Sequence, residues 1–512
     1  MVGWVTWFII GLSSIKPMTI VFWQDNKVHE LDRSQSDRSL LDYLRCEAGV
    51  KSVKEGCAQG DCGACAVTVV QADPHHGLHI RVVNSCIKPL LSLDQSLVFC
   101  ASDLPPEHPV VEAMLQSDAS QCGFCTPGFV MSLYGAFLEA RHKGVACIPD
   151  RAAALEVFSG NLCRCTGYVS LIDAALTMDT FSHSDVDWLA PIRSGLAVLD
   201  AYVKQKKDPN MISMLGAPGD LPIDPIVDTL REKAEHVDAS FVAGATDLGL
   251  WLSRKHQRPN GLLDLCRIPQ LTVSQHDGQG WRIGAARPLQ AVFDEMLVYW
   301  SELREYLERF AGRPIRSSAS LGGNLASASP IGDCIPLLWA MDARLSLKSW
   351  NLEAQAIQER ELSIDDFLKG YRRTALLPHE LIESILIPAS SKKLRFYARK
   401  ISKRWEDDIS SVSMVIGYSI NAEASFGDLA IALGGVAEQV LRAREVEALL
   451  RGQAFSLDKI AKACGVLQAL IRPIDDARAS AAYRRAICDE LFRSFISMIR
   501  CGALADAKES GY

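Results

Sequence analysis

The sequence has no surplus of positive charge. Its 54 lysines and arginines are outnumbered by 61 aspartates and glutamates, which gives a formal net charge of −7. Domains that bind nucleic acid usually present a basic face to the phosphates. We therefore expect no nucleic acid among the partners of this chain.

The sequence near its start also lacks an apolar run long enough to cross a bilayer. The apolar stretch 4–12 (WVTWFIIGL) has nine residues, whereas a membrane-spanning helix needs about 20. It has no preceding basic residue, because the first is Lys16, and no twin arginine, so it is a poor export signal. We expect Met18 to be the natural start, 1–17 to be an upstream extension or docked tail, and the membrane to play no part; a signal peptide is the alternative.

The cysteines lack the distribution of a disulfide framework. Eleven of the 16 precede residue 166, and several form tight C-x2-C and C-x-C pairs. In a chain of 512 residues such pairs are more typical of metal binding than of disulfides. We infer a reducing compartment, the cytoplasm, and a cofactor module at the N-terminal end.

The stretch 56–65 (GCAQGDCGAC) carries the first candidate metal site. Cys57, Cys62 and Cys65 have the spacing C-x4-C-x2-C, and Cys86 follows after twenty residues. This is the ligand pattern of a plant-type [2Fe–2S] cluster. The glycines suit a loop that turns sharply and aims N–H groups at sulfur. A zinc site is the alternative, although structural zinc more often uses two separated C-x2-C pairs.

A second cysteine set follows in two short motifs. QCGFCTPG supplies Cys122 and Cys125, and NLCRCTGY supplies Cys163 and Cys165. Each pair stands next to an expected helix, 128–138 or 152–158, so two loops can bring four thiolates to one place. A tetrahedral zinc site remains the alternative on spacing alone.

Element patterns divide the N-terminal half into domains. Short β-rich stretches, an amphipathic helix and a hairpin predict a small β-grasp ferredoxin domain over 18–101. A helical domain is expected over 102–180, and a linker over 181–232. The expected strands and helix of the first domain are 19–23, 27–31, 39–45, 66–70 and 78–83.

Two glycine-rich stretches mark the C-terminal half. Residues 239–249 indicate a strand, a glycine turn and a helix start, without the G-x-G-x-x-G pattern of a dinucleotide fold. Residues 316–333 (RSSASLGGNLASASPIGD) combine adjacent glycines with hydroxyls, which suits a pyrophosphate. A plain loop of small residues is the alternative for the second stretch. Further strands are expected over 409–420 and 428–436, and helices over 445–451 and 479–501.

Taken together, the motifs resemble the molybdenum hydroxylase family, and within it the iron–sulfur/FAD subunit of the bacterial xanthine dehydrogenase type. The resemblance covers about Thr19 to Arg500, and its most specific parts are the two cysteine sets and SLGGNLASASPIGD. It implies a multidomain α+β chain. The domains implied are a β-grasp ferredoxin domain (18–101), an α-helical [2Fe–2S] bundle (102–180), a vanillyl-alcohol-oxidase-type FAD domain (233–390) and an α+β flavoprotein C-terminal domain (391–505).

The resemblance also implies FAD-binding positions, and Gln121 matches a position close to the molybdopterin of a partner chain. The first FAD loop would wrap the pyrophosphate, Phe310 would pack near the flavin, and Asp333 would bind the adenosine part. Relatives often carry glycine or asparagine at the position of Ala245, and Trp405 is a bulky addition near the flavin face. The implied FAD-binding residues are Phe241, Val242, Ala243, Gly244, Ala245, Thr246, Asp247, Leu248, Gly249, Phe310, Ser320, Leu321, Gly322, Gly323, Asn324, Asp333, Ile382 and Lys400.

The activity implied is electron transfer. A large partner subunit with molybdopterin would oxidise a purine, xanthine to urate, and electrons would pass through two [2Fe–2S] clusters to FAD and then NAD+. An (αβ)2 heterotetramer is implied, and no catalytic acid or base is expected in this chain. The alternatives are a related hydroxylase subunit for aldehydes, carbon monoxide or N-heterocycles that uses O2 or a quinone, and a non-catalytic sensor or assembly protein.

Overall fold

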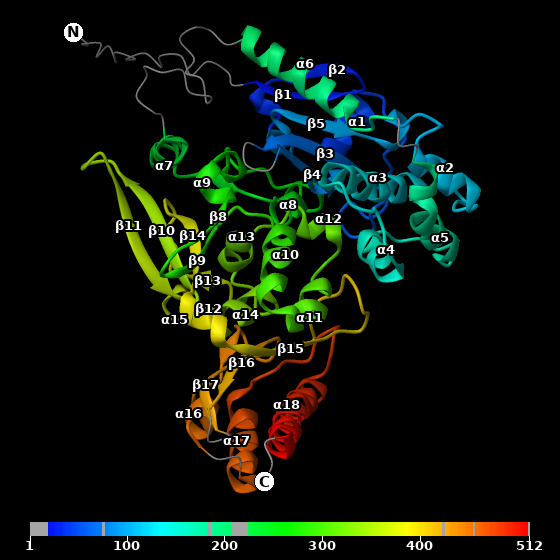
Figure 1. Cartoon of the computed structure of the whole chain (residues 1–512). Coiled ribbons are helices and arrows are strands. Elements are labelled where there is room, and N and C mark those ends of the chain that lie inside the picture. Colours follow the sequence, from blue (N-terminus) through cyan, green and yellow to red (C-terminus); the bar gives the residue numbers. More distant parts are fainter. Residues whose placement is uncertain are drawn as a thin grey trace, which may run out of the picture.

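The computed structural model describes residues 19–73, 77–182, 186–206, 224–421, 425–453 and 456–509. The expectations for 1–17 and Met18 lie outside the described residues. Figure 1 shows four parts in sequence order, from the blue ferredoxin sheet and cyan helices to a green and yellow middle part and an orange and red C-terminal part. This is the multidomain α+β architecture expected from the sequence.

The first part is a five-stranded sheet in the order β2-β1-β5-β3-β4, in which β1 and β5 run parallel and the other neighbours antiparallel. Helix α1 (Leu40–Cys46) begins at Ser39, whose hydroxyl oxygen accepts from the Asp42 N–H at 3.1 Å. A sheet with one crossing helix confirms the β-grasp prediction. The strands are β1 (Ile20–Gln24), β2 (Lys27–Leu31), β3 (Ala66–Asp73), β4 (Gly77–Asn84) and β5 (Ser96–Phe99).

The second part is helical and covers one face of that sheet. Its long helix α3 packs on β3 and β4, where Gly135 allows close approach because a Cβ there would overlap the Val82 side chain. Buried side chains of both parts form one apolar core. The helices are α2 (Pro109–Gln116), α3 (Thr126–Lys143), α4 (Arg151–Phe158) and α5 (Val169–Thr177).

The segment expected as a linker, 181–232, is folded at both of its described ends. Helix α6 (Ala190–Lys206) lies across β1, β2 and β5 and buries Ile192, Gly195 and Leu199. Helix α7 (Pro225–Glu235) follows and packs on strand β10 (Arg344–Asn351) of the third part. Each of the two helices therefore packs on a neighbouring domain and does not form part of a linker (Figure 1).

The third part combines a small parallel pair, β6 (Ser240–Val242) and β7 (Leu262–Asp264), with an antiparallel sheet in the order β11-β10-β14-β9-β8. Helices α10 and α14 pack into its core. The sheet strands are β8 (Ser274–His276), β9 (Gly280–Gly284), β10 (Arg344–Asn351), β11 (Ala356–Ser363) and β14 (Leu381–Pro388), with β12 (Leu368–Gly370) and β13 (Arg373–Thr374) as a separate pair. The helices are α8 (Leu248–Ser253), α9 (Pro269–Thr272), α10 (Leu289–Tyr299), α11 (Arg304–Glu308), α12 (Arg313–Arg316), α13 (Leu321–Ala326), α14 (Cys334–Ala340) and α15 (Ile364–Phe367).

The C-terminal part is a four-stranded antiparallel sheet with three helices on one face. The other face packs on α14, so this sheet shares a core with the third part. The expected strands and helices of this region are present. They are β15 (Arg395–Ile401), β16 (Val412–Ile420), β17 (Phe426–Gly434), β18 (Leu441–Arg442), α16 (Arg444–Leu450), α17 (Leu457–Leu470) and α18 (Ala481–Glu509).

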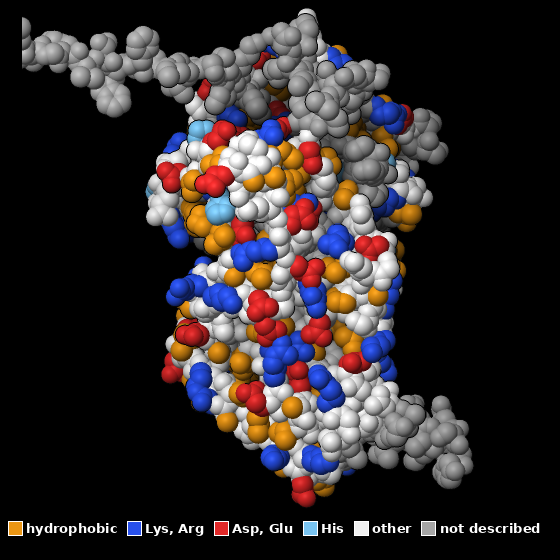
Figure 2. Space-filling view, turned by 90° about the vertical axis from the view of Figure 1, so that its left-hand side faces the viewer, with side chains coloured by type: hydrophobic (Ala, Val, Ile, Leu, Met, Phe, Trp, Pro, Cys, Tyr) orange, Lys and Arg blue, Asp and Glu red, His pale blue; other side chains and the backbone are white. Residues whose placement is uncertain are grey.

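The surface carries charges of both signs. Figure 2 shows acidic and basic side chains interspersed over one face of the molecule. Among the helices in the described ranges, none combines the length and apolar character that a membrane crossing requires.

Candidate functional site

The loop that carries Cys57, Cys62 and Cys65 is wound around a sulfur atom. Cys57 Sγ accepts hydrogen bonds from the backbone N–H groups of Gln59, Asp61 and Cys62 at 3.3–3.4 Å. Gly60 and Gly63 have φ of +78° and +67°, values that glycine adopts without steric cost. The loop therefore directs amide dipoles at a thiolate, as a cluster-binding loop requires.

The four thiols of the first set contact each other in pairs. Cys57 meets Cys62, Cys65 meets Cys86, and Cys57 also meets Cys86. Hydrogen bonding from Cys62 and Cys86, together with the backbone N–H groups, lowers the pKa of the Cys57 thiol well below its usual value. In the described part of the chain, no three Cys, His, Asp or Glu side chains converge as the ligands of one metal ion. Pairwise contacts suit a two-iron cluster with four thiolates, and the donor set fits.

The second set brings two separate loops together. Cys122 meets Cys165 and Cys125 meets Cys163, so each pair joins the α3 loop to the α4–α5 loop. Burial raises the pKa of Cys163, but hydrogen bonds from the Thr166 hydroxyl and the N–H groups of Thr166 and Cys165 outweigh it and lower that pKa to about 7. A thiol that ionises near neutral pH suits a metal ligand.

The two cysteine loops touch each other directly. The N–H of Leu162 donates to the Cys62 carbonyl at 3.0 Å, and Asn161 Nδ2 donates to the Gly63 carbonyl at 3.5 Å. Gly63 and Gly128 make this approach possible, because a Cβ on Gly128 would overlap the Gly63 carbonyl. The contact therefore joins Cys62 to the residue that directly precedes Cys163.

A cleft of about 950 Å³ lies between the first cysteine loop, the glycine-rich segments and the C-terminal part. Gln59, Gly60 and Asp61 form part of its wall. In the described structure, no residue of 122–125 or 163–165 lines it. The volume is within the usual range for cofactor sites. The first cysteine set is thus the one next to the cleft.

Most of the FAD positions expected from the sequence line this cleft. These are Phe241, Val242, Ala243, Gly244, Ala245, Thr246, Asp247, Leu248, Phe310, Ser320, Gly323 and Asn324. Six others do not line it: Gly249, Leu321, Gly322, Asp333, Ile382 and Lys400. Gly249 packs on the backbone after Cys86, since a Cβ there would overlap the Ile87 carbonyl, and Gly322 packs on Ala285 in the same way.

Asp333 and Lys400 are bound to each other behind the cleft. Lys400 Nζ lies 2.9 Å from Asp333 Oδ2, and both side chains are buried, with 3% and 4% exposed. Ser410 Oγ donates to the other carboxylate oxygen at 2.6 Å. Both carboxylate oxygens of Asp333 thus have partners within the protein, and its contact with adenosine stays a prediction.

The first glycine loop is pressed against the second. A Cβ on Gly244 would overlap the Ser318 carbonyl, and Ala245 next to it has a φ of +62°. This region disfavours residues with a Cβ. At the position of Ala245, where relatives often carry glycine or asparagine, those two residues would adopt this positive φ with less strain than alanine.

Several lining residues come from segments that the sequence motifs did not include. Residues 237–238 and the segments 374–378 and 407–409 contribute to the walls. Asp407 meets Asp61 there, and burial together with hydrogen bonding to that second carboxyl raises the pKa of Asp407 to about 7. The charge run 403–408 was the available signal for this segment, although a charge run is usually only a solvated surface.

The cleft fits an FAD molecule. Asn324 Oδ1 is shielded from solvent and has no hydrogen-bond partner within the described protein, although Asn324 lines the cleft. The Phe310 ring, which packs edge-on against Phe293 at 5.7 Å, supplies an aromatic surface. A buried acceptor, close-approaching glycine backbone and an aromatic wall match the amide, pyrophosphate and ring system of such a ligand.

Family models match four successive segments of the chain. These are a 2Fe–2S iron–sulfur cluster binding domain (24–87), a [2Fe–2S] binding domain (100–176), an FAD binding domain in molybdopterin dehydrogenase (224–390) and a CO dehydrogenase flavoprotein C-terminal domain (397–499). The matches favour iron–sulfur over zinc at both cysteine sets.

The chain is similar to curated proteins over most of its length. It is 30% identical to the xanthine dehydrogenase of Emericella nidulans, with 86% of this chain and 35% of that protein covered. It is 29% identical to the xanthine dehydrogenase/oxidase of Mus musculus, with 93% and 38% covered. The chain thus spans little more than a third of these relatives.

Two solved structures resemble parts of the chain. Carbon monoxide dehydrogenase from Hydrogenophaga pseudoflava is 24% identical, with a TM-score of 0.47 over 53% of this chain and 92% of that one. Quinoline 2-oxidoreductase from Pseudomonas putida 86 is 23% identical, with a TM-score of 0.47 over 54% and 95%.

Proposed function

The chain belongs to the molybdenum hydroxylase family, a family of oxidoreductases, and we propose that it is the electron-transfer part of a xanthine dehydrogenase. In this proposal a molybdopterin-bearing partner oxidises xanthine to urate, and this chain conducts the electrons to NAD+. The observation that carries the proposal is the cleft wall shared by Gln59–Asp61 and the Phe241–Leu248 loop. It brings the first cysteine set and the expected flavin site together.

The residues have distinct tasks in this proposal. Cys57, Cys62, Cys65 and Cys86 hold one [2Fe–2S] cluster, and Cys122, Cys125, Cys163 and Cys165 hold the other. When bound, the clusters carry single electrons and the flavin exchanges one or two, which allows a hydride to be passed to NAD+. The cleft-lining loops bind FAD, while Gly249, Leu321, Gly322, Asp333, Ile382 and Lys400 support them from behind.

The exposure of the second cysteine set supports its place at the partner side. Cys122 and Cys165 are exposed, and Gln121 is exposed beside them. Phe124 and Leu162, with 47% and 42% exposed, directly precede Cys125 and Cys163, the other two cysteines of this set. Exposed apolar side chains around a redox site suit a protein interface. We therefore assign this surface to the molybdopterin-bearing subunit, in an (αβ)2 assembly located in the cytoplasm.

Metal analysis and spectroscopy of the purified complex test the proposal. Two [2Fe–2S] clusters predict about four irons per chain and two distinct EPR signals after reduction. One non-covalent FAD is expected, which NADH should bleach. Bleaching by NADH no faster than the background rate would point instead to O2 or a quinone as acceptor. A chain with no flavin and one cluster or none would contradict the electron-transfer role itself.

Identification of the partner separates the substrate classes. The partner that co-purifies should contain molybdopterin, and xanthine should reduce the complex faster than an aldehyde, carbon monoxide or an N-heterocycle such as quinoline. Reduction by one of those three, without response to xanthine, would favour the related hydroxylase.

A further inference from the structure

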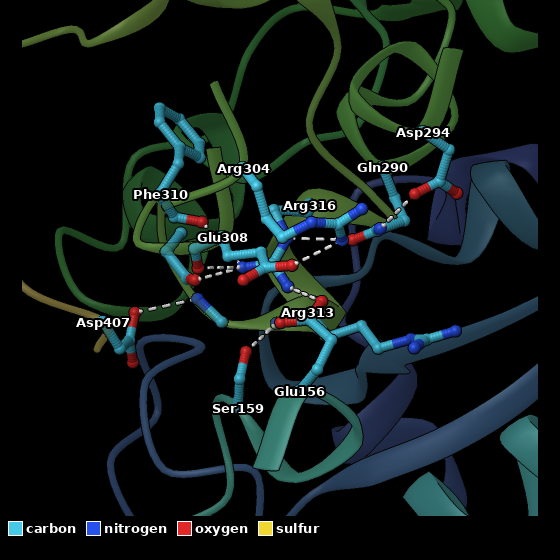
Figure 3. Close-up of polar contacts among 12 residues, drawn as sticks. Glu156, Ser159, Gln290, Asp294, Arg304, Glu308, Phe310, Arg313, Arg316 and Asp407 are labelled. Carbon is cyan, nitrogen blue, oxygen red and sulfur yellow. Dashed lines mark hydrogen bonds and ion pairs between the residues drawn. The ribbon is translucent and has the colours of Figure 1, made fainter. Parts of the chain in front are cut away.

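Arg316 is buried at the junction of the helical cluster domain and the flavin part. Its side chain is 1% exposed, and its guanidinium contacts five acceptors (Figure 3). Nη1 donates to the carbonyls of Glu308, Phe310 and Ala311 at 3.0, 2.9 and 2.7 Å. One charged group therefore binds nearly every carbonyl of the turn that carries Phe310.

This turn needs such a partner because no backbone N–H of the described residues donates to the carbonyls of Phe310 and Ala311. Ala311 has a φ of +48°, which interrupts helical geometry after Phe310. Buried carbonyls without a donor are costly, and a guanidinium is the side chain that can serve several at once. Arg316 therefore supplies donors to the backbone that carries the Phe310 ring.

The remaining donors of Arg316 fix its own position. Nε donates to Gln290 Oε1 at 2.8 Å, and Nη2 forms an ion pair with Glu156. Glu156 belongs to α4 of the helical cluster domain, seven residues before Cys163. Burial raises the pKa of the Glu156 carboxyl against the opposing effect of Arg316.

The backbones of the two domains also meet at this point. The N–H of Arg313 donates to the Ser159 carbonyl at 3.0 Å, and a Cβ on Gly312 would lie 2.5 Å from the Gly160 Cα. The N–H of Gly312 donates to Asp407 Oδ1 at 3.2 Å. The Phe310 turn is thus clamped between the α4 end, Arg316 and the 407 segment (Figure 3).

We propose that Arg316, oriented by Glu156, is the positioning residue for Phe310 at the flavin, so that docking of the helical cluster domain sets the flavin wall. The inference rests on the proposed FAD site. Arg316 and Glu156 do not line the cleft themselves, and Arg316 acts through the backbone of Phe310 and Ala311, which do. The pair gives the outer cluster domain a mechanical link to the flavin that does not involve electron transfer.

The chain offers a matched control at the same interface. Arg313 forms an ion pair with Glu139 of α3 at 3.0 Å, and no hydrogen bond of its side chain to the 308–311 carbonyls is found among the described residues. Arg313→Met therefore removes a salt bridge between the same two domains and leaves the Phe310 turn intact. Arg316→Met removes both the salt bridge and the turn donors.

The test compares Arg316→Met, Arg316→Lys and Glu156→Gln with Arg313→Met in the purified complex. Amide hydrogen exchange of 307–313 should speed up about tenfold in Arg316→Met, and the Kd for FAD should rise by a similar factor, because several charge-assisted bonds are lost. Arg316→Lys should change both quantities by an intermediate factor. Lysine keeps the positive charge but lacks the planar, forked set of N–H donors of a guanidinium. Glu156→Gln should shift both quantities by about threefold in the same direction.

Each outcome has a defined meaning. Equal changes in Arg316→Met and Arg313→Met would overturn the inference, because loss of an interface alone would then explain them. If Arg316→Met does not fold, Arg316→Lys and Glu156→Gln test the inference instead. Amide exchange of 307–313 that is unchanged in both variants would overturn it. Faster exchange in a chain that binds no flavin would leave Arg316 as the organiser of the turn and refute the FAD role instead.

Discussion

The backbone N–H of Leu162 lies 3.0 Å from the carbonyl oxygen of Cys62, and this hydrogen bond joins the two cysteine loops. Leu162 precedes Cys163, so a ligand residue of one set is bonded to the neighbour of a ligand in the other. The relative position of the two sets is therefore fixed by backbone atoms, which no side-chain change can remove without moving the chain.

Gly63→Ala should damage both cysteine sites together. Gly63 has a φ of +67°, and a Cβ there would overlap the Gly160 carbonyl and lie 2.5 Å from Asn161 Nδ2. We expect a loss of about 3 kcal/mol, from the left-handed backbone and the overpacking together. Chemical unfolding followed by cluster absorbance measures it.

Gly144→Ala is the matched control, because Gly144 has the same φ of +67° with no atom near its Cβ position. It should cost only about 1 kcal/mol. Equal costs for the two variants would contradict the tight loop contact.

Cys163→Ser should abolish one EPR signal and leave the other. Cys163 contacts Cys125 across the two loops and has a pKa of about 7, so its thiolate is available as a ligand. EPR of the reduced protein measures the result. Cys147→Ser, at a half-buried cysteine bonded to Arg141 in the same domain, should leave both signals unchanged. Loss of neither signal in Cys163→Ser would disprove the assignment.

Ala245→Gly should stabilise the flavin part of the protein. The φ of +62° at Ala245 is unfavourable for a residue with a Cβ, so glycine should gain about 1 kcal/mol. Thermal unfolding with and without added FAD measures it. Gly244→Ala, one position earlier, should abolish flavin binding, because its Cβ would overlap the Ser318 carbonyl. A decrease in stability for Ala245→Gly would show that the alanine methyl makes a contact of greater value.

Asp333→Asn should destabilise the protein far more than it changes flavin affinity. The buried ammonium of Lys400 would lose its partner, which typically costs about 3–5 kcal/mol. Denaturant unfolding and FAD titration measure the two effects separately. The double variant Asp333→Asn with Lys400→Met should recover part of the loss. A large drop in FAD affinity at unchanged stability would instead support a direct contact of Asp333 with the cofactor.

His108 should make the helical domain sensitive to acid. The ring is 4% exposed among Tyr134, Phe137 and Trp188, and burial lowers its pKa from 6.5 to about 4. The unfolded state therefore takes up the proton first as the pH falls. The neutral His108 ring therefore contributes its full stabilisation to the free energy of unfolding above pH 6.5. Between pH 6.5 and 4 this free energy falls by about 3 kcal/mol.

His108→Asn tests this pH effect without removing the helix cap. Nδ1 of His108 accepts from the Val110 N–H at 3.2 Å, and asparagine also caps helices. Unfolding free energies at pH 4–8 should fall less steeply in the variant than in the natural chain. Parallel curves would refute the assignment to His108.

The two candidate cysteine sets could be proposed from the sequence because the spacing within each motif is local. The loop 241–248 was implied as an FAD site only by the family resemblance, because a single glycine among its residues is a weak local signal. The contact between Leu162 and Cys62 could not be found, because a hundred residues separate the two loops and nothing in their spacing encodes their meeting. The ion pair between Asp333 and Lys400 could not be predicted either, because 67 residues separate the two side chains, and the adenosine contact of Asp333 stays a prediction.

Helix α6 was not predicted from the sequence, for a different reason. Lys204 and Lys206 and the loop-like sequence after them suggested a spacer, but Ile192 and Leu199 on one face are buried against the ferredoxin sheet. Two or three apolar positions on a largely polar helix give a weak periodic signal. The partner surface that buries them was visible only in the structure.

The ferredoxin sheet has one face covered by its own helix and the other by a different domain. The first face packs on α1, through Leu40, Leu41 and Leu44, while the second shares its core with the helical domain. During synthesis from the N-terminus, the sheet is complete at Phe99, but its second face waits for about 40 further residues, until α3 has been made. The nascent chain thus carries an exposed apolar surface during this interval, which chaperone binding would protect, and the ferredoxin domain expressed alone should aggregate.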